Sequence, residues 1–383
     1  MKKLLFFPFL LLLAGCWDTN QAERMYYIHG LGFDYKDEEY KIYAQIIDFT
    51  NIAKSEQPNP EATQVEVGIA NGRTFDEAFF NLYNSMDERL FFGHLSYVIF
   101  SENIVKENKA QPIVNAFIRY RELRYTTWAY VTNSSIDEIM STTPILNKSI
   151  TLSKLSDPLN SFSQSSLIRP IRFRELMIQL DEPSHEAHIP FVEVKENWTT
   201  NKGEDTIHGF SGMSIISKKS GLKGTIPLDQ ARGLQFMTDK TKRSSLTVKY
   251  PALDDPYITL NVDKVKPEII PIVTKDGVQF DITVKIIVTA NEFPAEENED
   301  KFQDAVKKEM KHEIEKTYKA GLEQDIDIYR LSEVVYRKEL KAWKKFQNDG
   351  KIPLNESSIR TLNIDFAQIK GERIITEKGE YDL

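Results

Sequence analysis

The chain has 383 residues and carries 57 acidic against 49 basic side chains, which gives a formal net charge of −8. This length is enough for about two or three domains with hydrophobic cores of their own. Phosphate backbones and anionic headgroups repel an acidic chain, which argues against nucleic acid as a partner and against membrane binding through surface charge.

The first sixteen residues have the layout of a secretory leader. Lys2 and Lys3 precede an almost wholly apolar run over 4–13, and Leu-Ala-Gly-Cys ends at Cys16, the single cysteine of the chain. Because the run is shorter than the ~20 residues of a membrane-spanning helix, residues 1–15 are predicted to be a cleaved signal peptide. The four residues ending at Cys16 resemble the bacterial lipobox, so Cys16 is predicted to carry a diacylglyceryl group that holds the protein on a membrane from outside the cytoplasm. A buried thiol at the end of an ordinary signal is the alternative.

Residues 16–26 are predicted to be a lipid-anchored tether, and residues 27–196 an N-terminal α/β domain. Strands are expected over 27–34, 40–47, 95–100, 126–131 and 191–194, and helices over 74–89, 112–121 and 167–180, with a short one after Ser135. Thr74 and Glu77 have capping-box spacing. Gly30 and Gly32 lack the third glycine of a phosphate-binding loop, so they predict a turn or bulge.

A His-Glu-Ala-His stretch at 185–188 invites a metal interpretation. The zincin motif needs two residues between Glu and the second His, on a helix, and here that His comes one residue early. Pro190 and a strand-like run follow directly. We therefore expect no metal site, and the missing nucleophile–base pair and phosphate loop predict no enzyme activity and no cofactor.

Residues 197–205 are polar and are predicted to be a linker, with a C-terminal α+β domain over 206–383. Strands are expected over 210–217, 222–226, 246–250, 257–265, 268–273, 278–290 and 359–369, largely as an antiparallel sheet, and helices over 228–237, 299–322 and 328–346. A further division into two lobes near 256–267 stays open. The helix over 299–322 is expected to pack on its own sheet, the alternative being a coiled-coil seam. The fold class is thus α+β.

Three guanidinium groups, from Arg119, Arg121 and Arg124, lie within six residues at the end of a predicted helix. Cations gather at helix C-termini because the helix dipole favours them there, and an ordinary solvated helix end explains the cluster. The alternative is a patch that binds an anion or an acidic loop of a partner through bidentate contacts.

Several short stretches occur in an order that identifies a family. They are Cys-Trp-Asp at 16–18, Gly-Leu-Gly-Phe-Asp at 30–34, Arg-Leu-Phe-Phe-Gly-His at 89–94, Val-Ile-Phe-Ser-Glu at 98–102, Arg-Tyr-Arg-Glu-Leu-Arg at 119–124, Gly-Phe-Ser-Gly-Met-Ser-Ile at 209–215, Gly-Leu-Lys-Gly at 221–224 and Asp-Ile-Asp-Ile-Tyr at 325–329. Together they resemble the Ger(x)C family, the lipoprotein C subunits of spore germinant receptors. The Ile-Tyr-Arg at 328–330 departs from that family's pattern of small or aromatic residues with a glycine.

The resemblance implies a non-enzymatic subunit that assembles with two polytopic membrane subunits, of A and B type, and helps them sense or transmit a nutrient signal in the spore inner membrane. It leaves direct binding of a small molecule open. The alternative is a solute-binding lipoprotein of an importer, which would need two similar parallel α/β lobes around a cleft. An extracytoplasmic hydrolase is disfavoured because the sequence offers no catalytic constellation.

Overall fold

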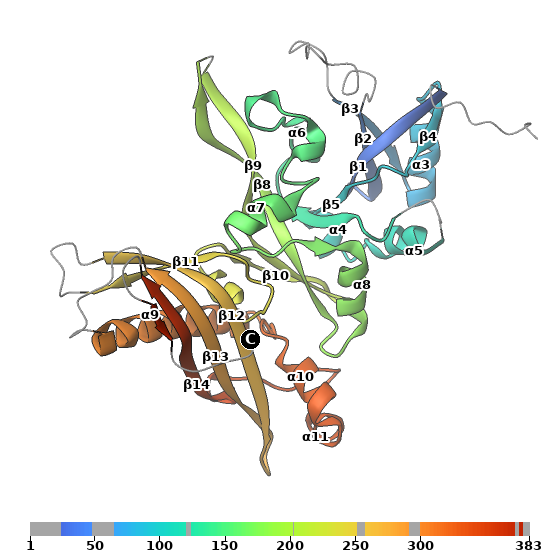
Figure 1. The fold of residues 1–383 in the computed structure, drawn as a ribbon. Helices are drawn as coiled ribbons and strands as arrows, with labels where there is room; N and C mark the ends of the chain where they lie inside the picture. Colours follow the sequence, from blue (N-terminus) through green and yellow to red (C-terminus); the bar gives the residue numbers. More distant parts are fainter. Residues whose placement is uncertain are drawn as a thin grey trace, which may run out of the picture.

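A computed structural model describes residues 24–47, 65–119, 124–201, 203–250, 257–290, 299–371 and 375–377. Over this part of the chain, two β-sheets of ten and five strands lie next to each other, each with packed helices (Figure 1). The first sheet is built by the N-terminal half and the second by the C-terminal half. This arrangement confirms the α+β fold class.

The first sheet has the strand order β10-β9-β8-β6-β5-β1-β2-β3, with β4 paired to β1 and β7 to β6. Its strands are β1 (Met25–Lys36), β2 (Glu39–Ile47), β3 (Val65–Gly72), β4 (Arg89–Phe91), β5 (Tyr97–Ser101), β6 (Trp128–Thr132), β7 (Ile171–Arg172), β8 (Glu186–Thr200), β9 (Gly203–Ser217) and β10 (Gly221–Pro227). The central strands β1, β5, β6 and β8 are parallel. The predicted β1–β2 hairpin is present, and its register shifts between Ile28 and Gly30, which is the predicted bulge.

Helices cover both faces of the first sheet. They are α3 (Phe75–Asn84), α4 (Glu102–Lys106), α5 (Gln111–Arg119), α6 (Ile136–Ser141), α7 (Pro158–Gln164) and α8 (Phe173–Asp181). Helices α3, α4, α5 and α8 share one hydrophobic core with the sheet, and α6 shares another core on the opposite face. The predicted cap of α3 is formed, because Thr74 Oγ1 accepts a hydrogen bond from the Glu77 backbone N–H at 3.1 Å. The helix ends at Asn84, before the predicted residue 89.

The second sheet has the order β11-β12-β13-β14-β15. Its strands are β11 (Ser244–Lys249), β12 (Tyr257–Val273), β13 (Val278–Ala290), β14 (Ile359–Gly371) and β15 (Ile375–Glu377). Neighbours are antiparallel except β13 and β14, which are parallel. Helix α9 (Glu299–Leu322) has the predicted bounds and packs on this sheet, with Phe302, Val306, Met310 and Ile314 fully buried. The chain continues through α10 (Leu331–Lys338) and α11 (Leu340–Phe346).

The predicted linker at 197–205 is wrong, because Trp198, Thr199 and Thr200 pair with Asp205, Glu204 and Gly203 at the end of the β8–β9 hairpin. The end of β8 is exposed, and a two-stranded ribbon in water carries the polar composition of a linker. Strands β9 and β10 consequently extend the first sheet to Pro227. The two lobes considered near 256–267 are also absent from the described part, since β12 runs unbroken through Pro267.

Three further predictions need correction. Residues 228–237 form only a 3₁₀ turn, η4 (Arg232–Phe236), in which the Gly233 N–H donates to Thr317 Oγ1 at 2.8 Å rather than within a helix. The strands expected at 257–265 and 268–273 are one strand, β12. Its pairing with β11 extends only to Val262, opposite Ser244, so the rest of β12 is an edge on that side, and an edge strand tolerates proline. The helix expected over 328–346 begins at Leu331 and breaks at Glu339, whose φ of −133° and ψ of 58° are not helical.

Helix α8 begins at Phe173, six residues after the predicted start, because residues 171–172 pair with β6 as the short strand β7. The predicted leader, Cys16 and most of the tether lie outside the described residues. The tether's last two positions are already the start of β1.

Candidate functional site

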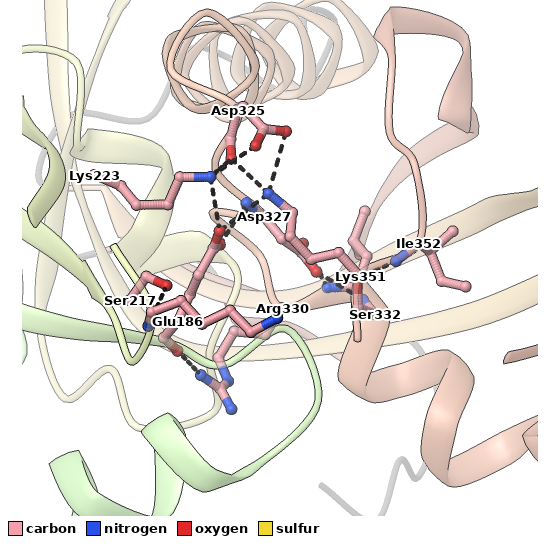
Figure 2. A network of polar contacts seen from close by, with 11 residues as sticks. Glu186, Ser217, Lys223, Asp325, Asp327, Arg330, Ser332, Lys351 and Ile352 are labelled. Atoms are coloured by element: carbon pink, nitrogen blue, oxygen red, sulfur yellow. Dashed lines mark hydrogen bonds and ion pairs between the residues drawn. The ribbon is translucent and has the colours of Figure 1, made fainter. Parts of the chain in front are cut away.

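A group of charged side chains joins the two sheets where they meet, and Figure 2 shows it from close by. We call it the inter-sheet cluster, and its members are Glu186 of β8, Lys223 of β10, Asp325 and Asp327 after α9, Arg330 before α10, and Lys351 between α11 and β14. These segments are far apart in the sequence. The cluster therefore exists only once both halves of the chain have folded against each other.

Glu186 is the centre of the inter-sheet cluster. Its side chain is 2% exposed, and its Oε1 lies 3.0 Å from Lys351 Nζ and 3.3 Å from Lys223 Nζ. Its Oε2 accepts a hydrogen bond from the Asp327 backbone N–H at 2.9 Å. A buried carboxylate is tolerated only when cations and hydrogen bonds compensate its lost hydration, and here all of these come from other segments.

Asp325 binds the same two lysines from the solvent side. Its Oδ2 lies 2.7 Å from Lys223 Nζ and its Oδ1 3.3 Å from Lys351 Nζ, while its side chain is 85% exposed. Burial opposes the charge of Lys223, but the hydrogen bond and ion pairs with Asp325 and Glu186 outweigh it and raise the pKa of Lys223. Although partial burial acts against it, the same contacts lower the pKa of Asp325.

Asp327 connects the cluster to the start of α10. It is fully buried, and its two carboxylate oxygens accept hydrogen bonds from the backbone N–H groups of Leu331 at 2.8 Å and Ser332 at 2.7 Å. These are N–H groups of the first turn, which have no partner within the helix. Burial raises the pKa of Asp327. Ser332 in turn accepts the Ile352 N–H at 2.9 Å, so the start of α10 is tied to the segment before β14.

Arg330 links α10 to the turn that precedes β8. Its Nη1 donates to the Glu186 carbonyl at 2.6 Å, its Nη2 lies 3.0 Å from Glu182, and its Nε lies 2.7 Å from Glu333. The residue has a φ of 53°, a left-handed conformation that is uncommon for a long side chain. Several interactions of the planar guanidinium hold it there.

A cavity of about 370 Å³ adjoins the cluster and is lined by residues of both halves. Its wall includes Glu186, Lys223 and Lys351. Lys219, in the turn before β10, forms an ion pair with Asp349, in the turn after α11. The charged groups of the cluster are engaged with one another. Chemically, this arrangement fastens two sheets together through paired charges, and its cations and carboxylates neutralise each other.

The His-Glu-Ala-His stretch contributes to this cluster through its glutamate. His185 lies in the preceding turn with Nδ1 3.1 Å from the Leu180 carbonyl oxygen, while Glu186 is the first residue of β8. Within the described residues no group of three or more His, Cys, Asp or Glu side chains could hold a metal ion. The role of Glu186 was missed by sequence reasoning, although a glutamate that opens an otherwise apolar strand was a usable signal.

The three arginines of the predicted patch are only partly described. Arg119 is the last residue of α5 and Arg124 follows the undescribed residues 120–123, both exposed. Neither forms an ion pair with another described residue. The position of Arg119 fits the helix-end explanation, and the patch stays a prediction, as does lipidation of Cys16, which lies outside the described part. Among the helices described, none is long and apolar enough to cross a membrane.

Comparison with known families covers most of the chain. Residues 18–194 match the model described as "Spore germination protein N-terminal domain", and residues 211–361 match "Spore germination B3/ GerAC like, C-terminal". The gap between the two matches falls on the β8–β9 hairpin.

Individual relatives agree with these family matches. The chain is 22% identical to "Spore germination protein KC" of Bacillus subtilis (strain 168), over 97% of this chain and 93% of that protein. It is 24% identical to "Spore germination protein B3" of the same organism, over 84% and 81%. A solved structure titled "Crystal Structure of the GerBC protein" superposes with a TM-score of 0.55 at 18% identity, over 93% of this chain and 100% of that one, which supports the fold.

Proposed function

The chain belongs to the Ger(x)C-type family of spore germination proteins, and from this we propose that it is a non-enzymatic subunit of a spore nutrient germinant receptor. It is held by lipid at Cys16 on the outer face of the cytoplasmic membrane, the inner membrane of the spore, and assembles there with two polytopic subunits of A and B type. The observation that carries this proposal is the pair of family matches, which cover both halves of the chain in order.

The inter-sheet cluster supports a mechanical role in such a receptor. Glu186 is buried against two lysines from two different segments, so a displacement of either sheet relative to the other would separate charges inside a poorly solvated junction. We infer from this cost that the two halves move together. A contact made by one half with a membrane subunit would be transmitted to the other half.

The importer alternative has less support from the fold. Solute-binding lobes are two similar α/β units, whereas the sheets described here differ in size and connectivity, one mixed with ten strands and one with five. A thermal-shift measurement with a panel of amino acids and sugars distinguishes a solute-binding lipoprotein from a receptor subunit. A solute-binding protein should show a higher melting temperature with its ligand, because tight binding to the folded state stabilises it.

The test is gentle crosslinking in spore membranes, followed by pull-down through the protein's soluble body and mass spectrometry. Two polytopic proteins, one permease-like, should be recovered. Recovery of an importer's permease and ATPase would instead identify the protein as a solute-binding lipoprotein of an importer. Arg119 and Arg124, which are exposed, and Arg121 are candidate contacts for an acidic loop of a partner, and their joint replacement should then reduce the recovery.

The lipid anchor has its own test. Cys16→Ala should shift the protein from the membrane fraction to the soluble fraction, because the variant has no site for the acyl chains. The triple arginine variant is the matched control, since it should remain in the membrane. Membrane retention of Cys16→Ala would overturn the anchor.

A further inference from the structure

The end of the first sheet at which β1 begins also contains β4, the start of β3 and part of α3. Strand β4 pairs with the first residues of β1, Met25 with Arg89 and Tyr27 with Phe91. The register through β2 places the first residue of β3, Val65, at the same end. Helix α3 follows the far end of β3 and packs back along it toward this end, with Ala78 against Gly72 and Leu82 and Met86 against Gly68.

This end exposes large aromatic side chains. Phe80 and Tyr83, on the C-terminal half of α3, are 65% and 42% exposed, and their ring centroids lie 6.2 Å apart. Phe91 of β4 is 37% exposed. Arg89 is exposed two residues before Phe91 on β4, and the exposed Arg24 pairs with Glu88 at 3.4 Å at the same end. Aromatic rings interspersed with arginines are typical of surfaces that rest in a lipid headgroup layer, where the rings leave water and the cations remain hydrated or contact phosphate.

The opposite end of the same strand has the opposite character. The turn after β1 carries Lys36, Asp37, Glu38 and Glu39, all exposed. The twelve residues of β1 separate the two ends by about 40 Å. Three acidic groups in four residues are repelled by anionic headgroups, so the two ends of β1 differ in their affinity for a bilayer.

The sequence connects the aromatic end to the lipid. Met25 follows Cys16 by nine positions, so even a fully extended chain keeps the start of β1 within about 30 Å of the acylated residue. We propose that this end of the first sheet, with Phe80, Tyr83 and Phe91, lies against the bilayer surface and sets the orientation of the body on the membrane. The inference rests on the lipid anchor of the proposed function.

The single native cysteine makes a direct test available. Acylation blocks the Cys16 thiol, so an introduced cysteine is the only reactive one in the full-length lipoprotein purified from membranes. Phe80→Cys and Phe91→Cys are labelled with an environment-sensitive fluorophore, and Lys36→Cys, exposed on the same strand at the far end, is the matched control. The proteins are placed in phosphatidylglycerol and phosphatidylethanolamine vesicles with and without headgroup-region spin-labelled lipid.

The labels at 80 and 91 should be quenched several-fold more strongly than the label at 36. Equal and weak quenching at all three, in protein that floats with the vesicles, would overturn the membrane-facing surface while leaving the anchor intact. Shielding of the labels at 80 and 91 only in spore membranes would assign this surface to a protein partner. Failure of the parent to float, or labelling of its Cys16, would overturn the anchor and this inference with it.

Discussion

At the scale of single residues, Glu186 is a buried carboxylate whose lost hydration is compensated by cations and a hydrogen bond. Its carboxylate is buried, yet Lys223 of the same sheet contacts it, and Lys351 and the Asp327 backbone N–H reach it from the other side of the junction. The two lysines are mostly buried, and Asp325 completes their neutralisation from solvent. The same two cations thus serve one buried and one exposed carboxylate, which allows the two contributions to be separated by mutation.

Glu186→Gln should lower the free energy of unfolding by about 3 kcal/mol, because it leaves two buried lysines with one partner fewer. Asp325→Asn, on the same lysines but at an exposed side chain, should cost less than about 1 kcal/mol. Urea denaturation followed by circular dichroism measures both. Equal losses for the two variants would show that burial of Glu186 does not set its contribution.

Two histidines outside the cluster should make stability depend on pH. Burial lowers the pKa of His29 from 6.5 to about 4 and that of His188 to about 3, the latter with help from the nearby charges of Arg330 and Arg169. The Nε2 of His188 is buried and has no hydrogen-bond partner among the residues that the structure describes. Between pH 6.5 and these lowered values the unfolded chain binds protons that the folded protein does not.

Stability should therefore fall as the pH is lowered from about 6.5 to about 4, by up to about 1.4 kcal/mol per pH unit for each histidine. His188→Leu should flatten this part of the profile, because it removes one of the buried histidines whose pKa is lowered in the folded protein. Melting temperatures at a series of pH values provide the measurement, with His312→Gln, at an exposed position of α9, as the control. An unchanged slope in His188→Leu would contradict the assignment.

At the scale of elements, the β9–β10 hairpin is fixed against α4 by its turn. Gly221 has a φ of +69°, and a Cβ built there would lie 2.1 Å from the carbonyl oxygen of Val105. Both the backbone conformation and the close approach exclude a side chain. This contact seats the strand that carries Lys223, so the turn also helps to position the inter-sheet cluster.

Gly221→Ala should destabilise the protein by about 1–3 kcal/mol, because the new methyl group must displace backbone and strain a positive φ. Gly277→Ala, in the β12–β13 turn, meets no atom within 4 Å and should change stability by less than about 0.5 kcal/mol. Thermal unfolding compares them. A Gly221 variant as stable as the Gly277 variant would mean that the hairpin can shift away from α4 at little cost.

At the scale of the whole molecule, the two sheets share hydrophobic core as well as charge. The largest buried cluster contains Met213, Ile215 and Ile226 of the first sheet together with Phe280 and Phe302 of the second half. Apolar contact and the inter-sheet cluster therefore act at the same junction. Neither half buries all of its apolar surface alone.

We expect calorimetry to show one cooperative unfolding transition, because separating the halves would expose part of the shared core and the buried charges of Glu186 and its lysines. A fragment that stops in the former linker region, at residue 205, should aggregate, since it cuts β9 and exposes the edge of β8. Two well-resolved heat-capacity peaks in the full chain would contradict this coupling.

The sequence by itself determined the helices, strands and turns whose periodicity or turn residues lie within a short stretch of chain. The cap at Thr74, the hairpin at β1 and β2, the full extent of β13 and the strict i+4 series of α9 all follow from local periodicity and turn chemistry, because each buries one defined face. The order of short motifs likewise determined the family. These features require no knowledge of where distant segments lie.

Tertiary structure decided what depends on distant partners. Within the predicted linker, Trp198–Thr200 pair with Gly203–Asp205 because β8 and β9 are neighbours in one sheet. Gly233 lies outside the predicted helix geometry and donates a hydrogen bond to Thr317. Glu186 lies in the junction because Lys223 and Lys351, 37 and 165 positions further along the chain, contact its carboxylate in the folded protein. A local pattern cannot encode such a pairing, because the charge at each position is compensated by groups that the sequence places far from it.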